Sequence, residues 1–166
     1  MAQNKWRSNS SVQGNSLHRI GTYDEFMAVW PHMLEGYEDL IAKSGANMSD
    51  LTIEEMFKTI LELSVYPERG FVGVLENKRG LPLGYLVAAN TTLAFRPKEL
   101  TLFVIWSNQK CPSTTRELMY ELKGWATSQG FKSIKGRMYK RSGAGMRFIS
   151  HVLGMRLTGM LYEVVL

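Results

Sequence analysis

The stretch that decides the fold is Leu100-Thr101-Leu102-Phe103-Val104-Ile105-Trp106, followed by a polar segment from Ser107 to Thr115. The run is almost wholly apolar and rich in β-forming side chains, so it predicts a central strand covered on both faces. An amphipathic helix is expected to begin at Pro112 and to end at Gly130. A strand that feeds a helix N-terminus through a tight loop gathers backbone N–H groups and the positive end of the helix dipole at one place. Such a crossover suits a phosphate group, so the sequence predicts a binding site there.

The helix after the crossover has a clear inward face. Thr114 and Glu117 have the spacing of a capping box, in which a Thr is followed three residues later by Glu. Apolar residues then recur at helical intervals and predict the face that packs on the sheet. They are Leu118, Met119, Leu122, Trp125 and Ala126.

Two further helices are predicted upstream by the same box spacing. Thr22 and Glu25 begin the first, and Pro31 is expected to kink or split it because proline lacks the backbone donor. Thr52 and Glu55 begin the second, which carries one apolar stripe.

The remaining segments read mainly as strands. Residues 71–75 and 85–89 flank a Gly-containing turn at 77–80, which predicts an antiparallel hairpin, and a weak strand is expected near 18–21. Downstream, the pattern predicts a strand over 131–139, a short helix over 144–153 and a closing strand over 157–166.

Length and composition favour one intracellular, soluble domain. The 166 residues suffice for a single core at 18–166, whereas residues 1–17 are rich in Ser and Asn and are expected to form a flexible arm. The single Cys111 excludes an intrachain disulfide, and the three His residues are too scattered for the usual zinc spacings. This spacing predicts no metal site. No apolar run is long enough to span a bilayer, so no membrane contact is predicted.

The net charge of +5 is concentrated near the C-terminal end of the chain, in a patch that would attract a polyanion. Its members are Lys132, Lys135, Arg137, Lys140, Arg141 and Arg147. Because Lys135 and Arg137 alternate along a predicted strand, their charges fall on one face, as expected for a solvated side. Nucleic acid is therefore the least favoured partner, and a phosphorylated cofactor is preferred.

The element order and several local pairs resemble the GNAT superfamily of acetyl-CoA-dependent N-acyltransferases. The pairs are Glu117-Leu118, Trp125-Ala126, Gly130-Phe131, the basic strand Ile134–Arg137, Leu153-Gly154-Met155 and Leu161-Tyr162-Glu163. The resemblance implies an α/β fold with a mixed, mostly antiparallel central sheet, helices on both faces, and a splay between the fourth and fifth strands. It also implies acetyl-CoA as the cofactor.

By this resemblance, the family's pyrophosphate loop falls on Lys110 to Thr115, and the thioester would be held by main-chain groups of Ile105, Trp106 and Ser107. Lys110 keeps a positive charge, but Ser113 and Thr115 replace the small residues of the family loop. Ser113, Thr114 and Thr115 therefore have two interpretations. They add hydroxyl donors to a phosphate site, or they only cap the helix.

The proton-transfer positions depart from the family as well. The place of the family's acidic Tyr holds Ser150, which is a poor acid at neutral pH, so His151 or Tyr139 would have to substitute. Glu99 is the carboxylate nearest to the central strand, but it precedes Leu100 and is expected at the end distal from the loop.

Two functions follow from these features. The first is an N-acyltransferase that passes an acetyl group directly to an amine whose identity the sequence does not reveal. The second is a non-catalytic GNAT-fold component of a phage virion or its assembly pathway. Both the phosphate loop and the acid position depart from the family, and the C-terminal pattern resembles GNAT-like proteins encoded by tailed phages. The corresponding locations are the host cytoplasm and the virion, and the partners of the second function would be phage structural proteins.

Overall fold

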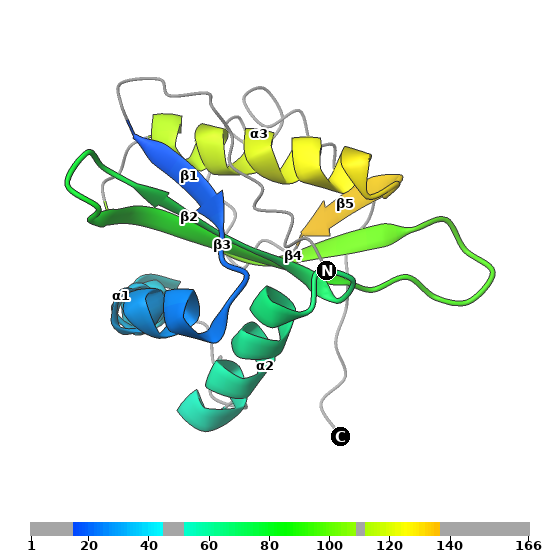
Figure 1. The fold of residues 1–166 in the computed structure, drawn as a ribbon. Helices are drawn as coiled ribbons and strands as arrows, with labels where there is room; N and C mark the ends of the chain where they lie inside the picture. Colours follow the sequence, from blue (N-terminus) through cyan, green and yellow to red (C-terminus); the bar gives the residue numbers. More distant parts are fainter. Residues whose placement is uncertain (1–14, 45–51, 109–111, 137–166) are drawn as a thin grey trace.

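A computed structural model describes residues 15–44, 52–108 and 112–136 of the chain. In this part of the chain, five strands and three helices follow one another (Figure 1). They are β1 (Ser16–Arg19), α1 (Tyr23–Ser44), α2 (Ile53–Val65), β2 (Gly70–Glu76), β3 (Pro82–Asn90), β4 (Glu99–Ser107), α3 (Pro112–Ser128) and β5 (Ser133–Gly136).

The five strands form one sheet in the order β1-β2-β3-β4-β5. All neighbours are antiparallel except β4 and β5, which pair in parallel from Glu99–Ser133 to Leu102–Gly136. Helices α1 and α2 cover one face of the sheet and α3 covers the other (Figure 1). The predicted α/β fold with a mixed, mostly antiparallel sheet is therefore confirmed. The predicted splay lies beyond Gly136 and falls outside the described residues.

Side-chain alternation along the strands creates two cores, one on each face of the sheet. The core under α3 contains Leu17, Phe71, Leu75, Leu86, Ala88, Leu100, Leu118, Met119, Leu122, Trp125 and Ala126. The core under α1 and α2 contains Ile20, Phe26, Val29, Met33, Tyr37, Met56, Ile60, Leu63, Val72, Val74, Tyr85 and Val87. The predicted inward face of α3 is thus confirmed in full.

A β-bulge at Phe103 interrupts the alternation of β4. Val87 of β3 is opposite Val104 and Ala88 is opposite Leu102, so Phe103 is one extra residue on β4. Before the bulge, Leu102 packs on the α3 side, whereas after it Val104 packs on the α1 side. The bulge consequently turns the end of β4 over, and Trp106 faces α1 instead of α3.

The segment ends follow the predicted signals. The capping box at Thr52 and Glu55 is complete, because each side chain accepts a hydrogen bond from the other residue's backbone N–H. Helix α3 begins at Pro112 and ends at Ser128. Beyond its end, the backbone N–H of Phe131 donates to the carbonyl of Ala126, and Gly130 between them has a φ of +78°, which favours glycine.

Three sequence expectations are corrected. Of the kink and the split expected at Pro31, the split is excluded, because helix α1 continues through this residue. The side chain of Phe103 is 55% exposed, so β4 is not covered on both faces along its length. Thr114 is the third residue of α3 and cannot be the cap of a box with Glu117, because it lies inside the helix.

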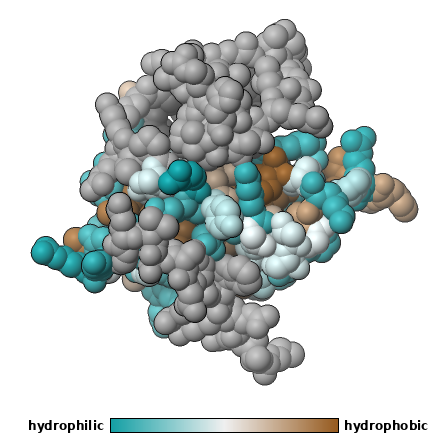
Figure 2. All heavy atoms as spheres, turned by 90° about the horizontal axis from the view of Figure 1, so that it is seen from above, coloured by the Kyte–Doolittle hydropathy of each residue, from teal (hydrophilic) through white to brown (hydrophobic). Residues whose placement is uncertain are grey.

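The two ends of the sheet differ in polarity. The β2–β3 turn is hydrophilic, whereas the loop from β3 to β4 ends in a hydrophobic tip that projects from the molecule at the right of Figure 2. Leu93 and Phe95 are exposed in this loop, and Phe95 has a φ of +65°.

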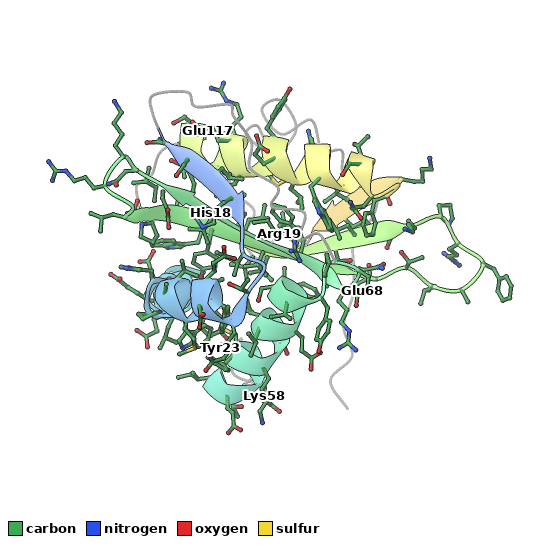
Figure 3. All side chains as sticks on the ribbon, viewed as in Figure 1. His18, Arg19, Tyr23, Lys58, Glu68 and Glu117 are labelled. Atoms are coloured by element: carbon green, nitrogen blue, oxygen red, sulfur yellow. The ribbon has the colours of Figure 1, made fainter. Side chains whose placement is uncertain are left out.

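Strand β1 is joined to the end of α2 by a long-range contact. Arg19 Nη2 donates to the carbonyl of Ser64 over 2.8 Å, at the C-terminal end of α2 (Figure 3). Because the last carbonyls of a helix have no intrahelical partner, this guanidinium satisfies a group that α2 itself cannot. β1 begins at Ser16, two residues before the predicted start of the domain.

Several predicted features lie outside the described residues: most of the arm at 1–17, the end of the strand at 131–139, the helix at 144–153 and the closing strand at 157–166. Within residues 15–44, 52–108 and 112–136, no helix has both the length and the hydropathy to cross a membrane.

Candidate functional site

The end of β4 is where the elements of the candidate site meet. Trp106 is opposite Tyr85 and Ser107 is opposite Gly84, so β3 holds this end of β4 in register. The backbone N–H of Asn108 donates to the carbonyl of Leu83 over 3.0 Å, so the pairing with β3 extends one residue past the end of β4. This end of β4 lies beside α1 on one face of the sheet and leads toward α3 on the other.

Trp106 joins β4 to α1. Its ring lies 5.6 Å from that of Tyr85, and its Nε1–H donates to Asp39 Oδ2 over 3.0 Å. Gly36 makes this approach possible, because a Cβ added there would lie 2.7 Å from both Trp106 Cδ2 and Tyr85 Cε1. Any larger residue at this position of α1 would push the helix away from the sheet.

Tyr85 is a structural residue. Its hydroxyl donates to the carbonyl of Met33 over 2.9 Å inside the α1 core. Burial raises the pKa of Tyr85 well above its usual value, and the neighbouring Tyr37 and Asp39 raise it further. The hydroxyl therefore keeps its proton at neutral pH and tethers α1 to β3.

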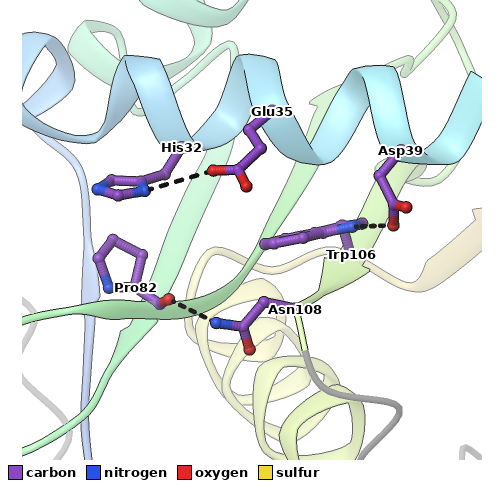
Figure 4. A pocket seen from close by; sticks show the side chains of 6 residues that line it. All are labelled: His32, Glu35, Asp39, Pro82, Trp106 and Asn108. Atoms are coloured by element: carbon purple, nitrogen blue, oxygen red, sulfur yellow. Dashed lines mark hydrogen bonds and ion pairs between the residues drawn. The ribbon is translucent and has the colours of Figure 1, made fainter.

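A pocket of about 250 Å³ opens between α1 and the ends of β3 and β4 (Figure 4). Its lining consists of His32, Glu35, Asp39, Pro82, Trp106 and Asn108. His32 Nδ1 lies 4.0 Å from Glu35 Oε2, and Asn108 Nδ2 donates to the carbonyl of Pro82 over 3.2 Å. The pocket is thus walled by two carboxylates, an imidazole, an indole and an amide.

The N-terminus of α3 packs closely on β3 on the opposite face of the sheet. A Cβ added at Gly84 would lie 3.1 Å from Thr114 Cγ2 and 2.5 Å from the Trp106 carbonyl oxygen. Thr114 is only 5% exposed, so its side chain fills this contact between the helix and the sheet. The glycine therefore allows the first turn of α3 to approach the sheet.

The first turn of α3 is compatible with a bound anion. It contains no acidic residue, whereas the first turns of α1 and α2 each contain two. Acidic residues stabilise a helix N-terminus through the dipole, and their absence leaves the positive end of α3 uncompensated by side chains of that turn. A phosphate at the N-terminus of α3 would therefore meet no carboxylate from the first turn of this helix.

The predicted cofactor residues are distributed over both faces of the sheet. Ile105 packs on the α3 side and Trp106 on the α1 side, with Ser107 at the end of the strand. Ser113 and Thr115 are half-buried in the first turn of α3. Lys110 lies outside the described residues, as do the predicted proton-transfer residues Tyr139, Ser150 and His151.

Glu99 lies at the opposite end of β4 from the crossover, as the sequence predicted. It pairs with Ser133 of β5, and its carboxylate forms an ion pair with Lys135. This pair joins the two parallel strands at their starts.

Sequence reasoning did not identify the acidic lining of the pocket. His32, Glu35 and Asp39 have the spacing i, i+3 and i+7, which places them on one face of α1, so the sequence contained a signal. This face of α1 meets Trp106 because of the bulge at Phe103. The run from Leu102 to Trp106 contains no glycine or turn residue that would mark the bulge in the sequence. Within residues 15–44, 52–108 and 112–136, this pocket included, no group of three or more His, Cys, Asp or Glu residues is arranged to hold a metal ion.

Neither a protein-family model nor a curated protein sequence matches this chain. Solved structures do match it. An aminoglycoside acetyltransferase from an uncultured soil metagenomic sample, in complex with sisomicin, matches with a TM-score of 0.70 and 11% identity over 92% of this chain and 97% of that one. The aminoglycoside N-acetyltransferase AAC(6')-Iy in complex with CoA matches with a TM-score of 0.67 and 9% identity over 99% and 98% of the two chains.

Glucosamine-6-phosphate N-acetyltransferase from Arabidopsis thaliana matches with a TM-score of 0.62 and 12% identity over 91% of this chain and 97% of that one. At these identities the likeness concerns the fold and leaves substrate and activity open. The chain has the fold of the GNAT acetyltransferases.

Proposed function

We propose that this protein is an acyl-CoA-dependent N-acyltransferase that passes an acetyl group directly to an amine. The observation that supports it most is the crossover from β4 to α3, in a fold shared with N-acetyltransferases over more than nine-tenths of the chain. In this crossover a bulged strand leads into a helix whose first turn lacks acidic residues. Both features suit a ligand with an anionic part and an extended arm.

The residues at the crossover fit the cofactor acetyl-CoA in charge. Its diphosphate would lie at the first turn of α3, held by backbone N–H groups, by the Ser113 and Thr115 hydroxyls and by Lys110. Thr114 would contribute through its backbone, because its side chain is buried toward Gly84. When bound, the cofactor supplies an acetyl group activated as a thioester.

The chain itself would position the reacting groups. Main-chain groups from Ile105 to Ser107 would hold the thioester carbonyl and stabilise the charge that develops on its oxygen. The amine nitrogen would attack the carbonyl carbon, so that a C–N bond forms as the C–S bond breaks. His151 or Tyr139, in place of an acid at Ser150, would supply the proton that the departing thiolate takes up, and the proton of the amine would pass to solvent. Orientation supplies most of the acceleration in such a reaction.

Thermal denaturation with and without acetyl-CoA tests the proposal, together with mass spectrometry of a panel of amines incubated with the protein and acetyl-CoA. At 100 times its dissociation constant the ligand should stabilise the protein by about 2.7 kcal/mol, a shift of about 5–11 °C. An absence of any shift at millimolar acetyl-CoA would overturn the enzyme proposal. A role as a phage structural or assembly component would then be the remaining candidate.

Ser113→Glu tests the location of the cofactor. A carboxylate in the first turn of α3 should leave the melting temperature of the free protein equal or higher through the helix dipole, yet repel a diphosphate. Ser113→Gln has nearly the same size without the charge and is the matched control. The proposal expects the acetyl-CoA shift to disappear in Ser113→Glu and to persist in Ser113→Gln. Equal shifts in the two variants would place the cofactor elsewhere.

A further inference from the structure

We infer that the pocket between α1 and the ends of β3 and β4 binds a protonated amino group of the acceptor, one that does not itself react. The inference rests on the proposed function and adds the class of acceptor to it. That class is a small molecule with at least two amino groups.

The charge of the pocket lining is opposite to that of the chain. Glu35 and Asp39 contribute two negative charges, whereas the chain as a whole has a net charge of +5 with His neutral. His32 is the basic side chain of the lining, and it lies beside Glu35. A cation is therefore the ligand that this pocket favours over its surroundings.

Two polar donors of the lining form hydrogen bonds with its own walls. Trp106 Nε1 donates to Asp39, and Asn108 Nδ2 donates to the Pro82 carbonyl. An anionic ligand would meet two carboxylates, whereas an ammonium would meet these carboxylates and an indole ring. Figure 4 shows His32, Glu35 and Asp39 descending from α1 toward Pro82, Trp106 and Asn108.

The size of the pocket limits what enters it. A volume of about 250 Å³ is below the range of about 300–1,000 Å³ for sites that enclose a drug-sized ligand. It suits one ammonium group and a few carbons attached to it, while the remainder of the acceptor stays outside. Trp106 is both a wall of this pocket and one of the three β4 residues predicted to hold the thioester, so the two sites adjoin.

The chemistry of the transfer separates the two amino groups. An amine attacks a carbonyl only when it is neutral, and an alkyl ammonium has a pKa near 10.4 in water. Ion pairing with Asp39, which is half-buried, and with Glu35, which is 78% exposed, favours the protonated form of the bound group and makes it the poorer nucleophile. The reacting nitrogen is then a second amine of the same molecule, outside the pocket.

Titration calorimetry with spermidine as the probe and n-butylamine as the single-amine comparison tests the inference. Glu35→Gln should weaken spermidine binding by about tenfold, because a charge-assisted contact is lost, and should leave any binding of n-butylamine less affected. The matched control is Glu38→Gln, which removes the same charge from an exposed position of α1 outside the pocket. It should leave spermidine binding unchanged.

The outcomes separate this inference from the proposed function. Acetyl-CoA binding together with spermidine binding that is equal in Glu35→Gln, Glu38→Gln and the unmodified protein would overturn the inference and leave the transferase proposal intact. An equal loss in both variants would also overturn it, because the effect would then be general attraction to an acidic helix. Loss confined to Glu35→Gln, together with spermidine-dependent release of CoA from acetyl-CoA that falls in the same variant, supports it. If spermidine binding depends on Glu35 but the protein does not bind acetyl-CoA, the bound amine is not an acceptor of the acetyl group and the inference is overturned.

Discussion

The indole N–H of Trp106 donates to Oδ2 of Asp39 over 3.0 Å and thereby joins the end of β4 to α1. The two residues are 67 positions apart in the chain. Trp106 reaches α1 because the bulge at Phe103 reverses the side of the sheet that the end of β4 presents. This contact forms part of the pocket wall and, together with the hydrogen bond from Tyr85 to the Met33 carbonyl, holds α1 against the sheet.

Trp106→Phe should lower the free energy of unfolding by about 1–3 kcal/mol, because it removes a hydrogen bond to a charged group while keeping an aromatic ring. Urea denaturation with an unchanged m-value measures the loss. A double-mutant cycle with Asp39→Ala, which removes the acceptor, isolates the hydrogen bond. Additive effects of the two substitutions would mean that the contact contributes no stability.

Gly36→Ala and Gly124→Ala should act in opposite directions, although both replace a glycine inside a helix. The Cβ at position 36 would lie 2.7 Å from two aromatic rings, so we expect a loss of about 1–3 kcal/mol from overpacking. The Cβ at position 124 meets nothing within 4 Å, so alanine should stabilise α3 by about 0.8–1 kcal/mol through helix propensity. Chemical denaturation measures the free energy of unfolding of both variants, and equal or higher stability of Gly36→Ala would contradict the packing described for Gly36.

Arg19→Met should destabilise the protein by about 1–3 kcal/mol, because the Ser64 carbonyl at the end of α2 would lose its charged donor. Burial lowers the pKa of Arg19, so the guanidinium is held in place against a desolvation cost that Met would relieve in part. Arg79→Met is the control, since Arg79 is exposed in the β2–β3 turn and should change stability by no more than about 0.5 kcal/mol. Similar melting temperatures for the two variants would argue against a structural role for Arg19.

Glu117→Gln should stabilise the protein at neutral pH and have no such effect in acid. Burial raises the pKa of Glu117 above its usual value despite the opposing charge of Arg116. The folded state therefore disfavours the ionised form, and this cost is present above the folded pKa and vanishes below the unfolded pKa of about 4.3.

The difference in melting temperature between Glu117→Gln and the unmodified protein should consequently be positive at about pH 7 and close to zero at about pH 3.5. Glu38→Gln, at an exposed position of α1, is the comparison. A difference that is the same at both pH values would show that the ionisation of Glu117 is not its cause.

The inward face of α3, the hairpin of β2 and β3 and the strand β1 could all be predicted from the sequence, because each depends on the spacing of residues close together in the chain. The capping box at Thr52 is local in the same way. The sequence does not decide between a kink and a split at Pro31, because proline removes a backbone donor in either case. In the structure the helix continues, and Val29 and Met33 on either side of Pro31 pack into the core. The spacing predicts Thr114 as a helix cap or as a hydroxyl donor to a phosphate, whereas the close approach of α3 to Gly84 buries its side chain.

By itself, the sequence determined which segments become helices and strands and where most of them end, since backbone hydrogen bonding and side-chain periodicity act between near neighbours. Only the tertiary structure decided that Trp106 meets Asp39 and that Glu35 borders the same pocket. The physical reason is the bulge at Phe103. In a run from Leu102 to Trp106 that is apolar throughout, no alternation shows which side of the strand faces which helix, so the pairing with β3 makes that choice.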